Sequence, residues 1–269
     1  STDAVFGTGA TNAITAGATA TANVTFTAQK IAVRDVITRE ADEDAIIAMV
    51  PFVRASLGRS VGEGVEDAVI NGDTSSNHQD ADTTSATDTA KAFNGLRVLT
   101  HADAKIDTAA SGSVLNANQI MNARAKMGKF AQTPSRLVIA TGMVGLAHMT
   151  ADTRFDANVA GAAAPIVTGQ VMQVFGSPLI TSGQIREDLN SAGVDGSEAN
   201  HTIALIWNQD SWAIGDMRQI TLEGMTDIFA DKVHVVASWR GQLQRVHAES
   251  TDHRNVAMVH DILTTALFA

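Results

Sequence analysis

The stretch that decides the fold is TREADEDAIIAMVPFVRASLGRSVGEGVEDAVING, from Thr38 to Gly72. Its apolar residues recur at steps of three and four, which places them on one face of a helix. At ~1.5 Å per residue, about thirty residues would make a rod of about 45 Å. The pattern predicts one long helix over 38–72, although such a helix alone is more typical of the core of an ordinary domain. The apolar positions are Ile46, Val50, Val53, Leu57, Val61, Val65 and Ala68, with Phe52 beside them.

The ends of this helix also have sequence signals. Thr38 is a good N-cap, and the acidic residues of 40–44 suit the positive end of the helix dipole. Asn71-Gly72 is a stop, because Gly tolerates the left-handed conformation that often closes a helix. Pro51 lacks an N–H and clashes with the preceding turn of a helix. We therefore expect either a kink at Pro51 or a short first helix followed by a long second one.

Composition excludes several classes of function. The chain has 269 residues, of which 45% are apolar, and a net charge of −10. It has no cysteine, which excludes disulfides and Cys-ligated metals. No run approaches the ~18–20 apolar residues of a membrane span. No two basic residues are adjacent, and proteins that bind DNA through its phosphates normally carry a basic patch. We expect no direct, specific DNA binding.

The first residues of the chain differ from the rest. Residues 1–29 contain no Lys or Arg and are dominated by Ala, Thr and Gly. Such a segment buries too little apolar area to offset its own ordering entropy. It is predicted to be a flexible tail, or an arm that becomes ordered on another surface. Alternation of Val24, Phe26, Ile31 and Val33 then predicts an extended strand or hairpin arm that runs into the long helix.

The remainder alternates between short helices and strands, so the predicted fold class is α+β. A polar loop follows Gly72, and a second helix starts near Ser113 or Asn116. Other predicted elements are a short strand or turn at 93–99, a buried strand at 135–141 and a small helix at 142–150. Further strands are predicted at 171–183 with a turn at 176–178, at 201–207, at 210–216 and 218–224, and at 231–250, where Val233, Val235, Ala237 and Trp239 share one face.

No catalytic, cofactor-binding or metal site is predicted. Gly7-Thr8-Gly9 is half of a dinucleotide loop, but no strand precedes it and Asn12 stands where the motif needs Gly. There is no GxSxG elbow and no Walker loop. Four histidines lie near aspartates without the fixed spacing of a metal motif, so we interpret them as scattered solvated side chains. These residues are His101, His247, His253 and His260, with Asp103, Asp252 and Asp261.

The order of these features resembles the major capsid proteins of tailed bacteriophages, which have the Hong Kong 97-type capsid fold. An Ala/Thr-rich arm leads through KIAVRDVITRE into the long helix that closes at EDAVINGD; then come FNGLRVL, SRLVIAT, VFGSPLITSG and KVHVVASWRGQLQRVHAES. Each motif is short, and the resemblance rests on their order over roughly 24–269. The residues that match family positions are Lys30, Thr38-Arg39-Glu40, Asn71-Gly72, Gly176-Ser177-Pro178-Leu179 and Arg240.

The resemblance implies a division of the chain into the parts of that fold. The long helix would be the spine of a peripheral P-domain, and the second half of the chain would form most of an axial A-domain. The implied parts are an N-terminal arm (1–20), an E-loop (21–38), a P-domain (39–112), an A-domain (113–215), return strands of the P-domain (216–250) and a C-terminal segment (251–269) that belongs to the A-domain.

The resemblance also implies a structural function without catalysis, cofactor or metal. Subunits of this family form hexamers and pentamers that close an icosahedral shell around double-stranded DNA, so the expected location is the virion, after assembly in the host cytoplasm. Implied partners are further copies of the chain, a portal, a scaffold or maturation protease, and a decoration protein; no membrane partner is expected. Removal of an N-terminal scaffold segment by that protease would account for a chain that begins at Ser1. Some members crosslink an E-loop lysine, and Lys30 is the E-loop lysine here.

Two alternatives remain open on the sequence. An encapsulin-like nanocompartment shell shares the fold and stores cargo enzymes in place of a genome. The other alternative is a hydrolase or another α+β enzyme, whose site would be formed by residues that are distant in sequence.

Overall fold

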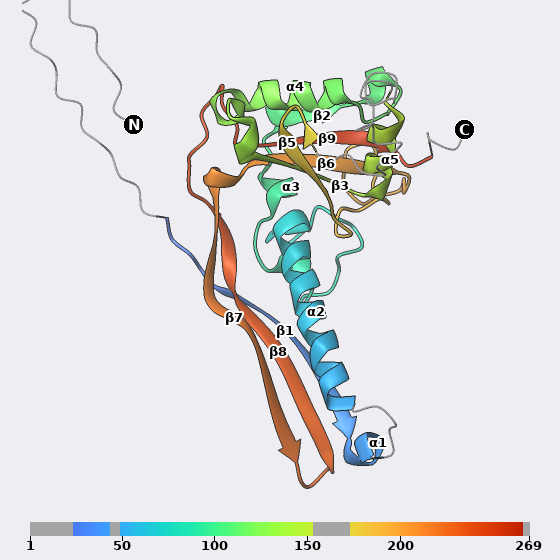
Figure 1. Ribbon diagram of the computed structural model, residues 1–269, viewed down its shortest axis with the longest axis vertical. Coiled ribbons are helices and arrows are strands. Elements are labelled where there is room, and N and C mark those ends of the chain that lie inside the picture. Colours follow the sequence, from blue (N-terminus) through green and yellow to red (C-terminus); the bar gives the residue numbers. More distant parts are fainter. Residues whose placement is uncertain (1–23, 44–48, 153–172, 266–269) are drawn as a thin grey trace, which may run out of the picture.

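Two sheets of different shape organise the chain. The computed structural model describes residues 24–43, 49–152 and 173–265. A three-stranded sheet and one long helix form an elongated leg, and a six-stranded sheet with shorter helices forms a head at one end of it (Figure 1). The predicted α+β class is confirmed.

The leg sheet has the strand order β1-β8-β7. Strand β1 (Gln29–Thr38) pairs antiparallel with β8 (Lys232–Arg245), and β8 pairs antiparallel with β7 (Trp212–Asp227). The predicted alternation along β8 is confirmed, because Val235, Ala237 and Trp239 are buried. The two short strands predicted at 210–216 and 218–224 are one strand, β7, whose register shifts between Asp216 and Thr221.

The long helix differs from the single helix predicted over 38–72. A short helix, α1 (Arg39–Glu43), precedes the long helix α2 (Met49–Asn71), and residues 44–48 lie outside the described part. The alternative of a short helix followed by a long one is therefore confirmed. Pro51 lies in the first turn of α2, where the missing N–H has no intrahelical partner to lose. Thr38 caps α1, since its Oγ1 accepts a hydrogen bond from the Ala41 N–H at 3.4 Å.

Helix α2 packs lengthwise on the leg sheet. The predicted apolar face is buried at Val53, Leu57, Val61 and Ala68, and Phe52 lies outside it at 65% exposure. Each large apolar side chain removed from water in this way contributes about 1.5–3 kcal/mol. The buried side chains between α2 and the leg sheet form one continuous core along the leg.

The helix ends at Asn71, as predicted, but for a different reason. Gly72 is not among the described glycines with positive φ. A Cβ at Gly72 would overlap the carbonyl oxygens of Ala68 and Phe93, because the chain returns against the end of the helix. The Gly95 N–H donates to the Gly72 carbonyl at 2.8 Å across this contact. Close approach of two backbone segments, not a left-handed turn, requires glycine here.

The head sheet has the strand order β2-β9-β6-β3-β5-β4. Its central strand β6 runs antiparallel to both neighbours, whereas β2 with β9 and β3 with β5 are parallel pairs. The bounds are β2 Lys105–Asp107, β3 Leu137–Thr141, β4 Gln173–Val174, β5 Ser177–Thr181, β6 His201–Asn208 and β9 Val256–Leu263.

Strand β6 joins the cores of the leg and the head. Its residues Ile203 and Leu205 belong to the cluster that contains the buried face of α2. Ala204 and Ile206 belong to the second cluster, under α4. Because both faces of β6 are covered, its sequence reads as a continuous apolar run instead of an alternating one.

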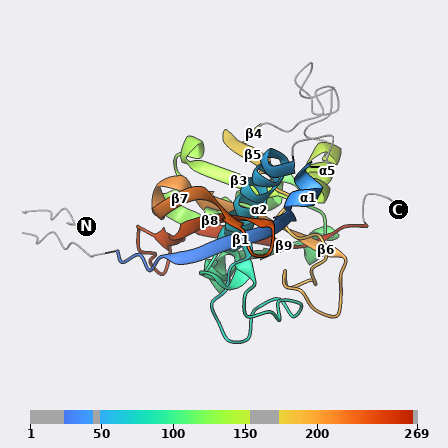
Figure 2. The ribbon, with the colours of Figure 1, turned by 90° about the horizontal axis from the view of Figure 1, so that it is seen from below.

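One helix covers the head on the side away from the leg (Figure 1). Asn116 caps α4 (Ala117–Met127), which confirms one of the two predicted starts, and α5 (Met143–Ala151) matches the small helix expected at 142–150. Viewed from below, the loops after α2 and before β6 project on the same side of the molecule (Figure 2). Short 3-10 helices lie at Thr89–Lys91, Ala102–Ala104, Ala109–Ser111, Gly128–Ala131, Pro134–Arg136 and Gln209–Ser211.

One local prediction was wrong, and one strand was missed. The segment 93–99, predicted as a short strand or turn, contains the helix α3 (Leu96–Leu99). Strand β9, which lies second from the edge of the head sheet, was not predicted at all. The break predicted at 176–178 is close to the observed turn, where Phe175 and Gly176 have positive φ between β4 and β5.

The implied domain boundaries stay predictions, and the structure gives only the positions of their elements. Strand β1, within the implied E-loop, pairs along its length in the leg sheet. Strand β2, within the implied P-domain, belongs to the head sheet. The first residues of β7, within the implied A-domain, belong to the leg sheet.

Replacement of Gly72 tests the close approach at the end of α2. Gly72→Ala should lower the free energy of unfolding by about 1–3 kcal/mol, because the added methyl meets backbone atoms that cannot move aside. Gly58→Ala is the matched control, since no atom lies within 4 Å of its Cβ position. It should raise stability by about 0.5–1 kcal/mol. Urea denaturation of the purified protein measures both, and equal effects would contradict the proposed role of Gly72.

Candidate functional site

The histidines and aspartates of the predicted scatter do not converge. His101 Nδ1 lies 3.2 Å from Asp103 on the surface. His253 accepts a hydrogen bond from the Lys129 N–H, and His260 bonds to a backbone carbonyl. In the described part of the chain, no group of three or more His, Cys, Asp or Glu side chains is placed to hold a metal ion.

One buried arrangement joins residues that are distant in sequence. His201 Nε2 lies 3.1 Å from Asp261 Oδ1, and Ser113 Oγ donates to Asp261 Oδ2 at 2.9 Å. Serine and histidine therefore both contact the aspartate, whereas a nucleophilic triad needs the histidine to contact the serine. Ser113 and Asp261 both have positive φ, which no sequence signal indicates. The arrangement anchors β9 to the segment before α4.

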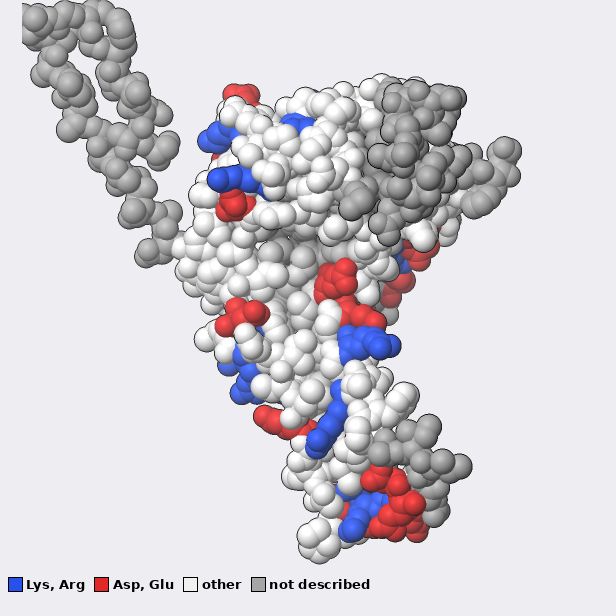
Figure 3. Space-filling model, viewed as in Figure 1, with Lys and Arg blue, Asp and Glu red and all other residues white. Residues whose placement is uncertain are grey.

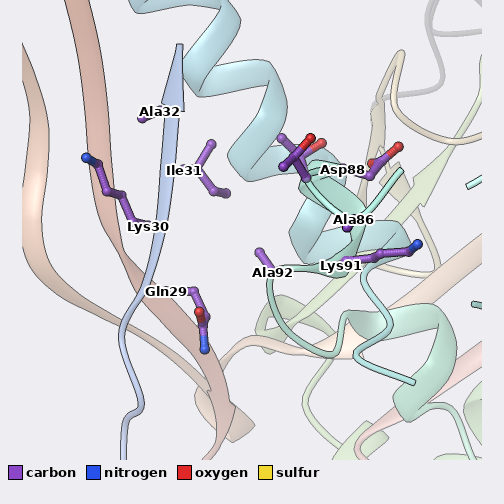
Figure 4. A pocket seen from close by; sticks show the side chains of 10 residues that line it. Gln29, Lys30, Ile31, Ala32, Ala86, Asp88, Lys91 and Ala92 are labelled. Carbon is purple, nitrogen blue, oxygen red and sulfur yellow. The ribbon is translucent and has the colours of Figure 1, made fainter. Parts of the chain in front are cut away.

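The hollow between β1 and residues 86–92 does not gather reactive groups either. It has a volume of about 430 Å³. Figure 4 shows Lys30 and Lys91 pointing to opposite sides. Asp88 accepts a hydrogen bond from the Ala90 N–H at 3.0 Å and so caps a short helix.

The partial dinucleotide motif, Gly7-Thr8-Gly9, lies outside the described residues. In the ranges that the structure describes, no helix is both long enough and apolar enough to cross a membrane.

The most constrained polar group is the guanidinium of Arg97, at the junction of leg and head. Arg97 is 1% exposed and donates two hydrogen bonds to Asp80, both of 2.9 Å. It also donates to Asn71 Oδ1 at 2.7 Å and to the Gly193 carbonyl at 2.8 Å. One side chain thereby joins the end of α2, the loop after it and the loop before β6.

A second arginine extends this network towards the surface. Arg186 contacts Asp82 and Asp188, each at 2.8 Å, and lies 3.6 Å from Asp80. Burial alone would raise the pKa of the Asp80 carboxyl, but the hydrogen bonds and charge of Arg97 hold that pKa below its ordinary value. The hydrogen bond from Arg186 lowers the pKa of Asp188 in the same way.

The far end of the leg exposes large apolar side chains. At the turn between β7 and β8, Ile228 is 82% exposed and Phe229 is fully exposed. Met225, near the end of β7, is 66% exposed. Figure 3 shows acidic and basic side chains gathered at the lower end of the leg. Exposed apolar side chains that gather at one end of a molecule are typical of an interface with another protein.

Comparisons with known proteins agree with this geometry. No protein-family model matches the chain. The chain is 28% identical over 225 residues to the major capsid protein of Escherichia phage T5. The matched region covers 83% of this chain and 44% of the T5 protein. The chain thus spans less than half the length of this relative.

Solved structures share the architecture at low identity. The capsid of Helicobacter pylori bacteriophage KHP30 matches with a TM-score of 0.58 at 10% identity, over 87% of this chain and 75% of that one. The SrpI encapsulin complex of Synechococcus elongatus matches with a TM-score of 0.54 at 10% identity, over 89% and 75%. The chain therefore has the fold of phage capsid and encapsulin chains. The resemblance to tailed-phage capsid proteins is confirmed, with the T5 protein as a relative in sequence.

Removal of the Arg97 side-chain charge tests the junction. Arg97→Met should lower the free energy of unfolding by about 3–5 kcal/mol, because Asp80 is left buried without its main partner. Arg136→Met is the matched control, since the Arg136–Asp210 pair is largely exposed and should be worth less than about 1 kcal/mol. Denaturation of the subunit in urea measures both variants. A loss for Arg97→Met no larger than for Arg136→Met would contradict the role of the junction.

Acid should weaken the same network. The folded pKa values of Asp80 and Asp188 lie below their unfolded values. The stability they contribute is therefore present above about pH 4 and is lost as the pH falls through the lower folded pKa values. The melting temperature of the subunit should be nearly constant close to neutral pH and fall below about pH 4. A melting temperature that holds or rises on acidification would contradict this.

Proposed function

We propose that the protein is a major capsid protein that assembles as hexamers and pentamers into an icosahedral shell. The shell would enclose the double-stranded DNA genome of a tailed phage, as part of the virion. The observation that carries the proposal is the exposed apolar turn of the leg, at Ile228 and Phe229. On a subunit with a shell-forming fold, such a surface gains its stabilisation only when another copy covers it.

The charge of the chain supports a container more than a DNA-binding protein. With a net charge of −10, the chain lacks the basic surplus that specific or tight binding to phosphates needs. Packaged DNA would be enclosed without sequence-specific contact. A portal, a scaffold or maturation protease, and a decoration protein are the further partners that we propose from the family, with assembly in the host cytoplasm and no catalytic step by this chain.

We assign the leg to the P-domain and the head to the A-domain of this fold. The leg contains the long helix α2 and the strands β7 and β8, and the head contains β6, β9 and α4. The assignment fits a subunit in which a compact head and an elongated leg make different contacts.

A nanocompartment shell is the second candidate. It is supported by the likeness to the SrpI encapsulin complex. The two candidates differ in what the particle contains: a nanocompartment would enclose protein cargo, and a capsid would enclose DNA.

Negative-stain electron microscopy of the purified protein, with size-exclusion chromatography on the same sample, tests the proposal. We expect closed polyhedral particles or their hexameric and pentameric units. Nuclease-protected DNA in particles from infected cells would favour the capsid, and co-purified protein cargo would favour the nanocompartment. A homogeneous monomer under all assembly conditions would contradict both.

Variants of the exposed turn sharpen this test. Phe229→Asn should reduce particle yield without a change in the melting temperature of the subunit, because the side chain contacts solvent in the free protein. Phe229→Leu keeps an apolar surface and should still assemble. Equal yields for the two variants would remove this turn from the interface.

A further inference from the structure

Three basic side chains lie side by side across the leg sheet. The Cα partners are Lys30 with Arg240, and Arg240 with Arg218. Paired residues of antiparallel strands project from the same face. Trp239 and Ile31, their neighbours in the chain, are buried in the cluster beneath α2, so the three project from the opposite, exposed face. We call Lys30, Arg218 and Arg240 the basic row.

The basic row has no anionic partner within the part of the chain that the structure describes. Other arginines, such as Arg97 and Arg186, lie in ion pairs, but none of the three does. Like charges directly opposite one another destabilise a sheet. The chain has 29 acidic and 19 basic residues, so an unpaired row of positive charge is unexpected. The row surrounds a hollow of about 380 Å³. The charge and the hollow together indicate an anionic partner.

The end of the leg has the complementary surface. We call residues 38–43 and 227–232 the leg tip; they contain five acidic and two basic residues. Glu40 and Glu43 are exposed and form no ion pair with another described residue. The tip also exposes Ile228 and Phe229. The tip thus combines a net negative charge with exposed apolar side chains.

The tip cannot reach the basic row of its own chain. Both lie along the same strand β1, and Lys30 is separated from Thr38 by about 26 Å at ~3.3 Å per residue. A contact between them must come from a second copy. Since the two surfaces differ, the contact is heterologous. A heterologous contact generates rings or continuing lattices instead of an isolated two-fold dimer.

We propose that the leg tip of one subunit docks on the basic row of a neighbouring subunit. This inference rests on the proposed function, and it names the surfaces that meet. Phosphates of enclosed DNA are the other anions available. The tip fits better, because phosphates would leave the exposed side chains of Ile228 and Phe229 without a partner.

Charge reversal with rescue tests the docking. The row variant is Arg218→Glu with Arg240→Glu, and the tip variant is Glu40→Lys with Glu43→Lys. Each should reduce particle yield by about tenfold or more, because like charges then face each other. A chain that carries all four changes should assemble again. Circular dichroism and melting of each subunit establish that the variants fold.

The control is a double reversal elsewhere. Arg59→Glu with Lys126→Glu makes the same change in net charge as the row variant, at exposed positions outside both surfaces, and should leave the yield unchanged. If the wild-type protein forms particles but the chain with all four changes does not, the docking is overturned and the proposed function stands. If the control loses assembly to the same extent, the loss is due to net charge, and the docking is overturned as well.

The remaining outcomes separate the docking from its rivals. Normal shells from the row variant that contain less DNA would assign the basic row to nucleic acid and overturn the docking. A wild-type protein that forms no particles or capsomers would overturn both the proposed function and the docking.

Discussion

The orientation of the leg relative to the head depends on the buried guanidinium of Arg97. Its planar fork of donors fits Asp80, Asn71 and the Gly193 carbonyl at once, and a flexible lysine could not replace this geometry. A buried ion pair contributes little net stability compared with apolar packing, and its best-attested role is to specify one arrangement. In the proposed shell, where each copy would present the same two ends to its neighbours, one fixed arrangement is what assembly would require. The shared apolar strand β6 supplies the stability that the ion pair does not.

Much of the fold could be predicted because its strongest elements have local signals. The buried face of α2, the cap at Thr38 and the alternation along β8 all follow from periodicity and short-range chemistry. Strand β9 was missed because its last residues include His260 and Asp261, which break the apolar run, and only pairing with β2 and β6 makes it a strand. The helix α3 has four residues, too few for a periodic pattern.

The candidate surfaces were much less visible in the sequence. Lys30 and Arg240 were singled out only by their resemblance to family positions, and their pairing with Arg218 depends on the register of three strands. The exposure of Phe229 likewise depends on how far β7 and β8 extend beyond the head. The local propensities of the residues determine neither the register of the strands nor how far they extend beyond the head. A sequence can indicate which residues are apolar or charged, but the register decides which of them remain for a neighbour.

Hydrogen–deuterium exchange compared between assembled particles and the dissociated subunit tests the central claim most directly, because it reports where one copy covers another. The account predicts that the largest gain in protection on assembly falls in the leg, on β1, on β7 and at the turn around Phe229, with the core of the head already protected in the free subunit. Exchange in the leg that is unchanged by assembly, with new protection confined to the head, would contradict it.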